Sequence, residues 1–396
     1  MATKASFFNG QARSCAKLAF MCVLLASIAG RAQAVTEQVL YSFMGGFGGP
    51  DAAYPFPSLI RDAAGNLYGT TPTGGAYGRG TVYVVSPNGT EKLLHSFTGG
   101  TDGDGPQSSL IQDASGYLYG TTESGGTYGS GVVFVMNPTS GAEKVLYSFT
   151  GGADGSDPIA SLVRDSRGFL YGTTSGGGAY GRGTLFVVSP NGSEEVLYSF
   201  TGGTDGGFPR AALIEDAQGL FYGTTPVGGL FGDGVVFRFD RSRGETVLHS
   251  FTGGADGSIP YSSLIEDANG NLYGTTQQGG AYGYGIVFIM SSRTGAEKVL
   301  HSFTGGRDGS YPDAGLIQDV NGNLYGAARA GGTNGLGTVF LLIPTTGTLK
   351  VLYSFAGGTD GNTPESSLIQ DSNHNLYGTT WDGGAYGWGT VYMLVP

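Results

Sequence analysis

Short runs of apolar residues, bounded by glycine, asparagine, aspartate or proline, recur along the whole chain. Four such runs follow one another in a typical stretch: SSLIQD (Ser108–Asp113), YLYGTT (Tyr117–Thr122), VVFVM (Val132–Met136) and EKVLYSF (Glu143–Phe149). They are rich in β-branched and aromatic residues and show no helical period, which is typical of β-strands. The pattern therefore predicts four short strands and no helix in this stretch.

This four-strand pattern is repeated seven times. The phenylalanine that ends the fourth run recurs at Phe43, Phe97, Phe149, Phe200, Phe251, Phe303 and Phe355. The step is 51 or 52 residues, except for a first step of 54. Four strands in a unit of this length are typical of a β-propeller blade. We predict an all-β fold, a seven-bladed β-propeller with four antiparallel strands per blade. A β-solenoid is the alternative, although its rungs are usually shorter.

The two ends of the repeat array complement each other. The array begins with a fourth strand, EQVLYSF (Glu37–Phe43), and ends with a third strand, TVYMLV (Thr390–Val395). Pairing of these two strands would complete the last blade and remove two open sheet edges. We therefore expect the N-terminal strand to close the ring, an offset for which a solenoid gives no reason.

The first 34 residues have a different character. Basic residues precede the apolar run LAFMCVLLASI (Leu18–Ile28), and AQA (Ala32–Ala34) provides a cleavage site of small residues. This order predicts a secretory signal peptide over residues 1–34, followed by the propeller over residues 35–396. An uncleaved anchor is the alternative, but the apolar run is too short to span a bilayer, and no later run approaches that length.

Composition supports an exported, packed protein. The 75 glycines recur at fixed positions, and 23 tyrosines and 22 phenylalanines can form a core, so the chain is not of low complexity. Both cysteines, Cys15 and Cys22, precede the expected cleavage site. Removal of the leader leaves 16 basic and 31 acidic residues, a net charge of −15. Such a charge argues against nucleic acid and anionic membranes as partners and permits binding of cations.

The repeat resembles a known family. NLYGTTPTGGAYGRGTVYVV (Asn66–Val85), repeated seven times together with VLYSF, is similar to the bacterial GloVer tandem-repeat proteins. The resemblance covers essentially all of the chain after the leader and implies an exported bacterial protein. It implies no activity, because the function of the family is not generally established. Some members carry a C-terminal surface-anchoring segment, and we do not expect one here because the repeats run to Pro396.

Long and short loops alternate along each unit. In a propeller, the fourth-to-first and second-to-third connections share one face, and here both are long and glycine-rich, as in FTGGTDGDGP (Phe97–Pro106) and GGTYGSG (Gly125–Gly131). The other face carries tight turns such as DANGN (Asp267–Asn271), which imitates the start of an EF-hand loop but lacks its later glycine and glutamate. Because binding usually resides on long loops, we assign it to the glycine-rich face.

An aspartate recurs in the fourth-to-first loop of six units, and FMGGFGGP in the first unit lacks it; the six are Asp102, Asp154, Asp205, Asp256, Asp308 and Asp360. These aspartates could form Asx-type turns or contribute to Ca²⁺ sites. A calcium site needs six to eight oxygens, and one aspartate per blade does not supply them. We favour the turn, keep Ca²⁺ as the alternative, and expect no other cofactor.

An aromatic residue recurs in the second-to-third loop of six units, with asparagine in the sixth: Tyr77, Tyr128, Tyr180, Phe231, Tyr282 and Tyr386. Exposed aromatic rings could stack on sugars. The other interpretation, which we favour, is that each ring packs against the neighbouring blade.

Positions that differ between units are better candidates for a specific site. Both tryptophans of the chain, Trp381 and Trp388, lie in the last unit's loop, with Asp382 beside them. Arg79 of the first unit and Arg329 of the sixth belong to the two neighbouring blades. We predict that these five residues form a ligand-binding patch.

Catalytic motifs are largely absent. No zinc-protease, nucleophile-elbow or phosphate-binding motif is present, and the four histidines, His95, His249, His301 and His374, are dispersed. First strands such as ASLVRD and AALIED stay close to consensus, which favours binding over catalysis. We expect a monomeric, non-catalytic propeller that binds a glycan or a protein in the periplasm, at the cell surface or outside the cell. The alternative is a secreted hydrolase or lyase acting on polysaccharides.

Overall fold

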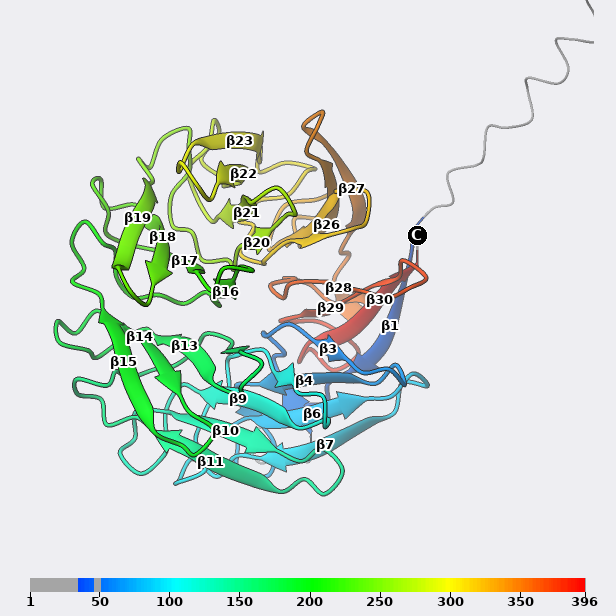
Figure 1. The fold of residues 1–396 in the computed structure, drawn as a ribbon. Helices are drawn as coiled ribbons and strands as arrows, with labels where there is room; N and C mark the ends of the chain where they lie inside the picture. Colours follow the sequence, from blue (N-terminus) through cyan, green and yellow to red (C-terminus); the bar gives the residue numbers. More distant parts are fainter. Residues whose placement is uncertain (1–34, 46–50, 396) are drawn as a thin grey trace, which may run out of the picture.

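The computed structural model describes residues 35–45 and 51–395. In this part of the chain the regular structure is β throughout, apart from one 3₁₀ turn, η1 (Gly358–Asp360). The strands form seven four-stranded antiparallel sheets around a ring, which makes a seven-bladed β-propeller (Figure 1). The predicted fold is confirmed, and the solenoid alternative is wrong. The expected signal peptide, residues 1–34, lies outside the described residues.

Each blade runs outward from the central channel in strand order. The first strands are short: β3 (Ile60–Arg61), β8 (Ile111–Gln112), β12 (Val163–Arg164), β16 (Ile214–Glu215), β20 (Ile265–Glu266), β24 (Ile317–Gln318) and β28 (Ile369–Gln370). The second strands carry the YG pair: β4 (Leu67–Thr71), β9 (Leu118–Thr122), β13 (Leu170–Thr174), β17 (Phe221–Thr225), β21 (Asn271–Thr276), β25 (Leu324–Ala328) and β29 (Leu376–Thr380).

The third and fourth strands complete the blades. The third strands are β6 (Thr81–Val85), β10 (Val132–Met136), β14 (Thr184–Val188), β18 (Val235–Asp240), β22 (Ile286–Ser291), β26 (Thr338–Ile343) and β30 (Thr390–Val395). The fourth, outermost strands are β7 (Glu91–Ser96), β11 (Glu143–Ser148), β15 (Glu194–Ser199), β19 (Gly244–Ser250), β23 (Glu297–Ser302), β27 (Thr348–Ser354) and β1 (Thr36–Ser42). A two-residue bridge, β2 (Ala52–Ala53) with β5 (Thr73–Gly74), lies outside the blades. We number the blades 1 to 7 by their first strands, from β3 to β28.

The N-terminal strand closes the ring. β1 pairs antiparallel with β30 from Thr36↔Val395 to Ser42↔Thr390, so that blade 7 combines the two ends of the described chain (Figure 1). Phe43 follows β1 and is fully buried in an apolar cluster with Tyr83 of blade 1. The predicted closure is confirmed, and β30 is paired on both sides, with β29 and with β1.

The core is divided among the seven seams between blades. At the first seam, Phe97 at the end of blade 1 packs against Phe134 of blade 2, with ring centroids 5.3 Å apart. Equivalent apolar clusters occupy the other six seams. The recurrent phenylalanine therefore joins each blade to the next, and burial of both sheet faces explains why β4 and β13 are buried throughout their length.

The two glycine-rich loops of each blade lie together, as expected. In blade 2, the Asp104 N–H donates to the Ser124 carbonyl over 2.8 Å, and the Gly126 N–H donates to the Gly100 carbonyl over 2.8 Å. These bonds join the fourth-to-first connection to the second-to-third loop. We call the face that carries these loops the loop face.

Candidate functional site

Each recurrent aspartate closes its own glycine-rich loop. Asp154 accepts hydrogen bonds from the Thr150 N–H over 2.7 Å and from the Tyr147 hydroxyl over 2.9 Å, and its other oxygen accepts from the Thr150 hydroxyl. Burial acts to raise the pKa of Asp154, but these hydrogen bonds outweigh it and hold the pKa below its ordinary value. We call this arrangement the aspartate clasp. It is the kind of turn that was favoured from the sequence.

Histidine replaces tyrosine in three of the clasps. The Nε2 atoms of His95, His249 and His301 lie 3.3, 3.2 and 3.1 Å from carboxylate oxygens of Asp102, Asp256 and Asp308. Asp205 and Asp360 accept from Tyr198 and Tyr353. Within the described ranges, histidine, cysteine and acidic side chains do not gather in groups of three that could hold a metal ion.

The first unit has its own clasp, contrary to the expectation from the sequence. Asp51 accepts from the Tyr41 hydroxyl over 2.9 Å and from the Met44 N–H over 2.6 Å. Three additional residues lie between Phe43 and Pro55 compared with other units, which accounts for the first step of 54 residues and moves the aspartate later in the loop. Fixed spacing from the phenylalanine therefore missed it.

The recurrent loop aromatics are exposed. The exposed fractions of Tyr77, Tyr128, Tyr180, Phe231, Tyr282 and Tyr386 lie between 59% and 62%. None belongs to the apolar clusters of the described residues. The favoured interpretation, that these rings pack into the neighbouring blade, is wrong.

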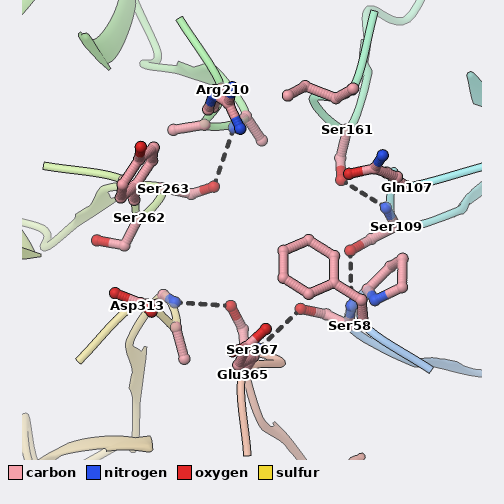
Figure 2. A pocket seen from close by; sticks show the side chains of 18 of the residues that line it. Ser58, Gln107, Ser109, Ser161, Arg210, Ser262, Ser263, Asp313, Glu365 and Ser367 are labelled. Atoms are coloured by element: carbon pink, nitrogen blue, oxygen red, sulfur yellow. Dashed lines mark hydrogen bonds between the residues drawn. The ribbon is translucent and has the colours of Figure 1, made fainter. Parts of the chain in front are cut away.

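The central channel opens on the loop face into a cavity of about 320 Å³ (Figure 2). A ring of serines at the start of the first strands forms part of its wall. The backbone N–H groups of Ser58 and Ser109 donate to the hydroxyl oxygens of Ser109 and Ser161, each over 2.9 Å, and the Ser367 N–H donates to the Ser58 hydroxyl over 2.9 Å. This ring of hydrogen bonds joins neighbouring blades across the seams, including the seam where the chain closes.

A second set of side chains lines the cavity, one from each blade, directly after the proline that precedes the first strand. These residues all differ: Phe56, Gln107, Ile159, Arg210, Tyr261, Asp313 and Glu365. The repeat therefore holds seven different side chains in one ring. We call these the post-proline residues.

An unusual backbone turn directs the post-proline residues into the cavity. The residue before the proline has a positive φ in blade after blade, including β-branched Ile259 at 57° and Thr363 at 58°. Such a conformation is rare for β-branched residues and persists only where neighbouring structure holds it. Two backbone hydrogen bonds hold Ile259 in this conformation. Its N–H donates to the Asp233 backbone carbonyl over 2.9 Å, and its carbonyl accepts from the Gln277 backbone N–H over 3.0 Å.

The acidic side of the cavity is built around one arginine. Arg329 Nε lies 3.5 Å from Asp313, and Arg329 Nη1 lies 3.6 Å from Glu365. Burial raises the pKa of Asp313 to about 6, against the opposing charge of Arg329. Burial and the charge of Asp313 raise the pKa of Glu365 to about 7. Arg329 thus lies within 3.6 Å of two carboxyl groups, and both have pKa values closer to neutral pH than an ordinary carboxyl group.

The aromatic side of the cavity lies at the closing seam. Trp381 stacks on Tyr54 with ring centroids 5.0 Å apart, and its ring centroid lies 6.0 Å from that of Phe56 in an edge-on arrangement. The Trp388 ring lies edge-on to Tyr54 with ring centroids 5.1 Å apart, and it belongs to the apolar packing of the closing seam, next to Gly45.

The predicted patch is only partly brought together. Arg329 lines the cavity, Trp381 borders it, and Asp382 lies close enough to Glu365 to raise the pKa of that carboxyl group. Trp388 faces the seam instead. Arg79 lies apart, in an ion pair with Asp104 at 2.9 Å.

The post-proline residues were missed by sequence reasoning, although a signal was present. The proline recurs in every unit, and the residue after it differs in every unit. The first strands that follow, such as SSLIQD and ASLVRD, stay close to consensus, so the variation is confined to the single position after the proline. Polar residues that occur in one blade only, such as Arg210 and Asp313, therefore converge on the cavity, although the first strands beside them are nearly the same in every blade.

The described residues contain no helix that is long enough and apolar enough to cross a bilayer. No curated protein matches the chain.

Solved structures of propellers are similar in fold. One is the extracellular domain of a protein from B. thetaiotaomicron named a hybrid two component system, at a TM-score of 0.58 and 12% identity, covering 88% of this chain and 39% of that one. Another is oligogalacturonate lyase from Vibrio parahaemolyticus, at a TM-score of 0.57 and 11% identity, covering 92% and 94%. A protein from Bacteroides uniformis named a 6-phosphogluconolactonase has a TM-score of 0.51 and 17% identity, covering 81% and 88%. At these identities the likeness shows the fold alone, and this chain spans only 39% of the first structure's length.

The sequence repeat is more informative than these distant structures. The sequence profile described as the Gloeobacter/Verrucomicrobia repeat matches residues 30–229, 121–323 and 213–396. The three overlapping matches extend over all seven blades and include the YG and SF positions on which the resemblance to GloVer proteins was based. The chain therefore belongs to the Gloeobacter/Verrucomicrobia repeat family.

Proposed function

We propose that this protein is an exported, non-catalytic propeller that binds a glycan at the channel mouth on the loop face. The observation that carries this proposal is the ring of post-proline residues, which differ in every blade and meet around one cavity. A repeat that served only the fold would have no need for seven different side chains there. The predicted leader, and the extracellular propeller from B. thetaiotaomicron among the similar folds, support the exported location.

The aromatic side of the cavity suits a sugar ring. Tyr54 and Trp381 offer flat apolar surfaces next to Phe56. The face of an aromatic ring is electron-rich and attracts the polarised C–H groups on one face of a pyranose. Phe56 lines the cavity and lies edge-on to Trp381, so a glycan that enters the channel would meet this aromatic cluster on one side and the hydrogen-bonding groups of Arg329 and Glu365 next to it.

The opposite side of the cavity favours an acidic sugar. Arg210 has no carboxylate partner in the part of the chain that the structure describes, and its guanidinium lies over the Tyr261 ring, 5.7 Å from the centroid. Ala212 and Gly315 also interrupt the serine ring, so that the N–H groups of Ser161 and Ser263 meet no serine hydroxyl on the next blade. A guanidinium and two backbone donors together suit a carboxylate or sulfate on the ligand.

A glycan array on the purified protein, run with and without Ca²⁺, tests binding directly. We expect retention of oligosaccharides that carry an acidic group, and no dependence on Ca²⁺ because the aspartate clasps are already satisfied by Thr, Tyr and His donors. Loss of retention on Arg210→Gln, with neutral sugars unaffected, would support the acidic specificity. Failure to retain any glycan would contradict the proposal.

The two tryptophans provide a paired test of the cavity. Trp381→Ala should weaken glycan affinity by about 1–3 kcal/mol, the scale of an interface anchor, with little change in melting temperature. Trp388→Ala should lower the melting temperature, because Trp388 packs in the closing seam, and should leave affinity nearly unchanged. Calorimetry and thermal melting on both variants separate these roles. A Trp381 variant that melts early and binds normally would remove Trp381 from the site.

The alternative function is a hydrolase or lyase that acts on polysaccharides. The observation that favours it is the pair Asp313 and Glu365, whose pKa values of about 6 and 7 suit a general acid and a general base near neutral pH. Incubation with neutral and uronic-acid polysaccharides, followed by assays for reducing ends and unsaturated products, tests this function. Turnover that is abolished in both Asp313→Asn and Glu365→Gln variants would replace the binding proposal.

A further inference from the structure

The exposed aromatics of the second-to-third loops form a second ring on the loop face, distinct from the channel mouth. We call Tyr77, Tyr128, Tyr180, Phe231, Tyr282 and Tyr386 the rim aromatics. Their exposed fractions differ by no more than 3 percentage points, from 59% to 62%. Six blades therefore present an aromatic side chain to solvent to the same degree.

The backbone around each rim aromatic leaves the ring accessible. A glycine with positive φ follows the aromatic residue, and a Cβ built on it would meet no heavy atom within 4 Å in five of the six blades, at Gly129, Gly181, Gly232, Gly283 and Gly387. The space beside this glycine is therefore open, and the preceding ring is itself about 60% exposed. A flat ligand can approach it without moving the loop.

Blade 6 shows that the fold does not need the aromatic ring. It carries Asn334 in this place, yet the N–H of Gly335 donates to the Gly332 carbonyl over 3.4 Å, just as the Gly129 N–H donates to Gly126 over 3.3 Å in blade 2. The backbone of the loop thus closes in the same way without the ring, and the Asn334 side chain in its place donates to the Phe355 carbonyl over 3.0 Å. Retention of an exposed aromatic residue in the other six blades calls for a role at the surface.

Hydrogen bonds connect the loops of the rim aromatics to the strands that carry the clasp tyrosines and histidines. In blades 2 and 3, the N–H groups of Thr127 and Ala179, one residue before the rim aromatic, each donate to a serine hydroxyl over 3.4 Å. That serine directly follows the clasp tyrosine, Tyr147 or Tyr198, whose hydroxyl donates to the clasp aspartate. A carboxylate that accepts hydrogen bonds therefore lies near the exposed ring. An aromatic face next to a carboxylate acceptor matches a sugar, which offers C–H groups on one side and hydroxyl donors at its edge.

We propose that the rim aromatics form a multivalent binding surface for an extended polysaccharide with a regular repeat, of the kind found in cell walls and extracellular matrices. The rings are separated by glycine-rich loops and do not merge into the continuous apolar patch that a stable protein interface needs. A set of equal sites in a ring suits a ligand that offers equal groups many times, because each added contact raises overall avidity. The net charge of −11 disfavours nucleic acid and anionic bilayers. This surface does not depend on glycan binding at the channel mouth.

Pull-down on insoluble cellulose, chitin and purified peptidoglycan tests the proposal. We expect the purified protein to be retained on at least one of these polymers. Single changes such as Tyr128→Ser should weaken retention about 2–5-fold, and successive changes at all six rim aromatics should weaken it at least about 100-fold. Melting temperatures should stay unchanged, because the rings are exposed and contribute little to packing.

Two control variants isolate the rim. Tyr117→Ser removes an exposed tyrosine from the tight turns of the opposite face and should leave retention unchanged. Val320→Ser removes an apolar side chain that is 92% exposed in a tight turn of the same opposite face, and it should also leave retention unchanged.

Four results would overturn the proposal. The first is that the wild-type protein is not retained on any of the three polymers, and the second is that the variant with six changes is fully retained. The third is that a single change abolishes retention. The fourth is that the protein self-associates and that the rim variants abolish this self-association. The last would identify the face as a contact between copies of this chain.

Discussion

The glycine of the YG pair lies where a side chain has no room. In blade 2, a Cβ built on Gly120 would lie 2.7 Å from Phe134 Cζ and 3.1 Å from Leu110 Cδ2, both buried core atoms. Atoms this close would have to shift, and the tightly packed seam resists such movement. The same contact with the third-strand aromatic recurs at Gly172, Gly223, Gly274 and Gly326. The glycine therefore sets the distance at which the strand can pass the aromatic ring.

We predict that Gly120→Val destabilises the protein by about 3 kcal/mol, since overpacking of a filled core forces strained side chains and backbone shifts. Ser130→Val is the matched control, because Ser130 occupies the variable position between two loop glycines, and it should cost less than about 1 kcal/mol. Urea unfolding followed by circular dichroism measures both. Equal midpoints for the two variants would show that the glycine has no packing role.

At the scale of elements, β1 is the strand on which the ring depends. It is the outermost strand of blade 7, and the residue that follows it, Phe43, fills the seam with blade 1. β1 therefore contributes both backbone pairing to β30 and apolar contacts to the neighbouring blade. Its loss would open two surfaces at once.

Deletion of residues 37–43 should lower stability by several kcal/mol and leave β30 as an open edge. Open edges pair with other chains, so oligomers should appear at micromolar concentrations. Thermal melting and size-exclusion chromatography report the two effects. A deletion variant that melts with the wild type and elutes as a monomer would show that closure through β1 is dispensable.

The outer strands also carry a recurrent carboxyl group. Glutamate stands at the start of the fourth strand in six blades, and each carboxyl group is partly buried near the clasp aspartate of the preceding blade: Glu37, Glu91, Glu143, Glu194, Glu245 and Glu297. Burial, and then the charge of that aspartate, raise the pKa from 4.5 to about 8 for Glu91 and to about 7 for Glu297. Blade 6 has Leu349 instead, which confirms that an apolar side chain fits the position.

At the scale of the whole molecule, these glutamates make stability depend on pH. A carboxyl group with a raised native pKa adds stability that is complete below its ordinary pKa and is lost as the pH rises through the native value. The clasp aspartates with lowered pKa, Asp102, Asp154 and Asp308, act in the opposite direction and lose their contribution as the pH falls below about 4. Stability should therefore be highest at about pH 4 to 4.5 and should fall from there to about pH 8, the highest native pKa of these glutamates.

Melting temperatures measured from pH 3 to pH 9 should decline between about pH 4.5 and pH 8, where the glutamates are ionised in the unfolded chain but still protonated in the folded one, and should level off above pH 8. Glu297→Gln should flatten this decline and stabilise the protein at pH 9 by about 1 kcal/mol, after allowance for partial exposure. Lys298→Gln, an exposed neighbour on the same strand, should not. A Glu297→Gln profile that is parallel to the wild type would rule out this carboxyl group as a source of the dependence.

The repeat itself determined the architecture. Strand period, turn residues and the phenylalanine of each unit are local features, and they were enough to predict seven blades and four strands per blade. Closure by Glu37–Phe43 also followed, because the missing fourth strand and the spare one can be counted along the chain. The clasp of the first unit did not follow, since three added residues moved Asp51 out of the expected spacing.

The cavity was decided by the tertiary structure alone. Tyr54 and Trp381 lie near opposite ends of the chain and stack only because the ring closes. Asp313 and Glu365 come from successive blades and meet at Arg329 because first strands converge on one axis. The exposure of the rim aromatics was likewise decided in three dimensions, since a recurrent ring can face a seam or solvent with the same spacing. Local patterns specify how each blade folds, whereas the side chains that share a site depend on how seven blades are arranged around a common channel.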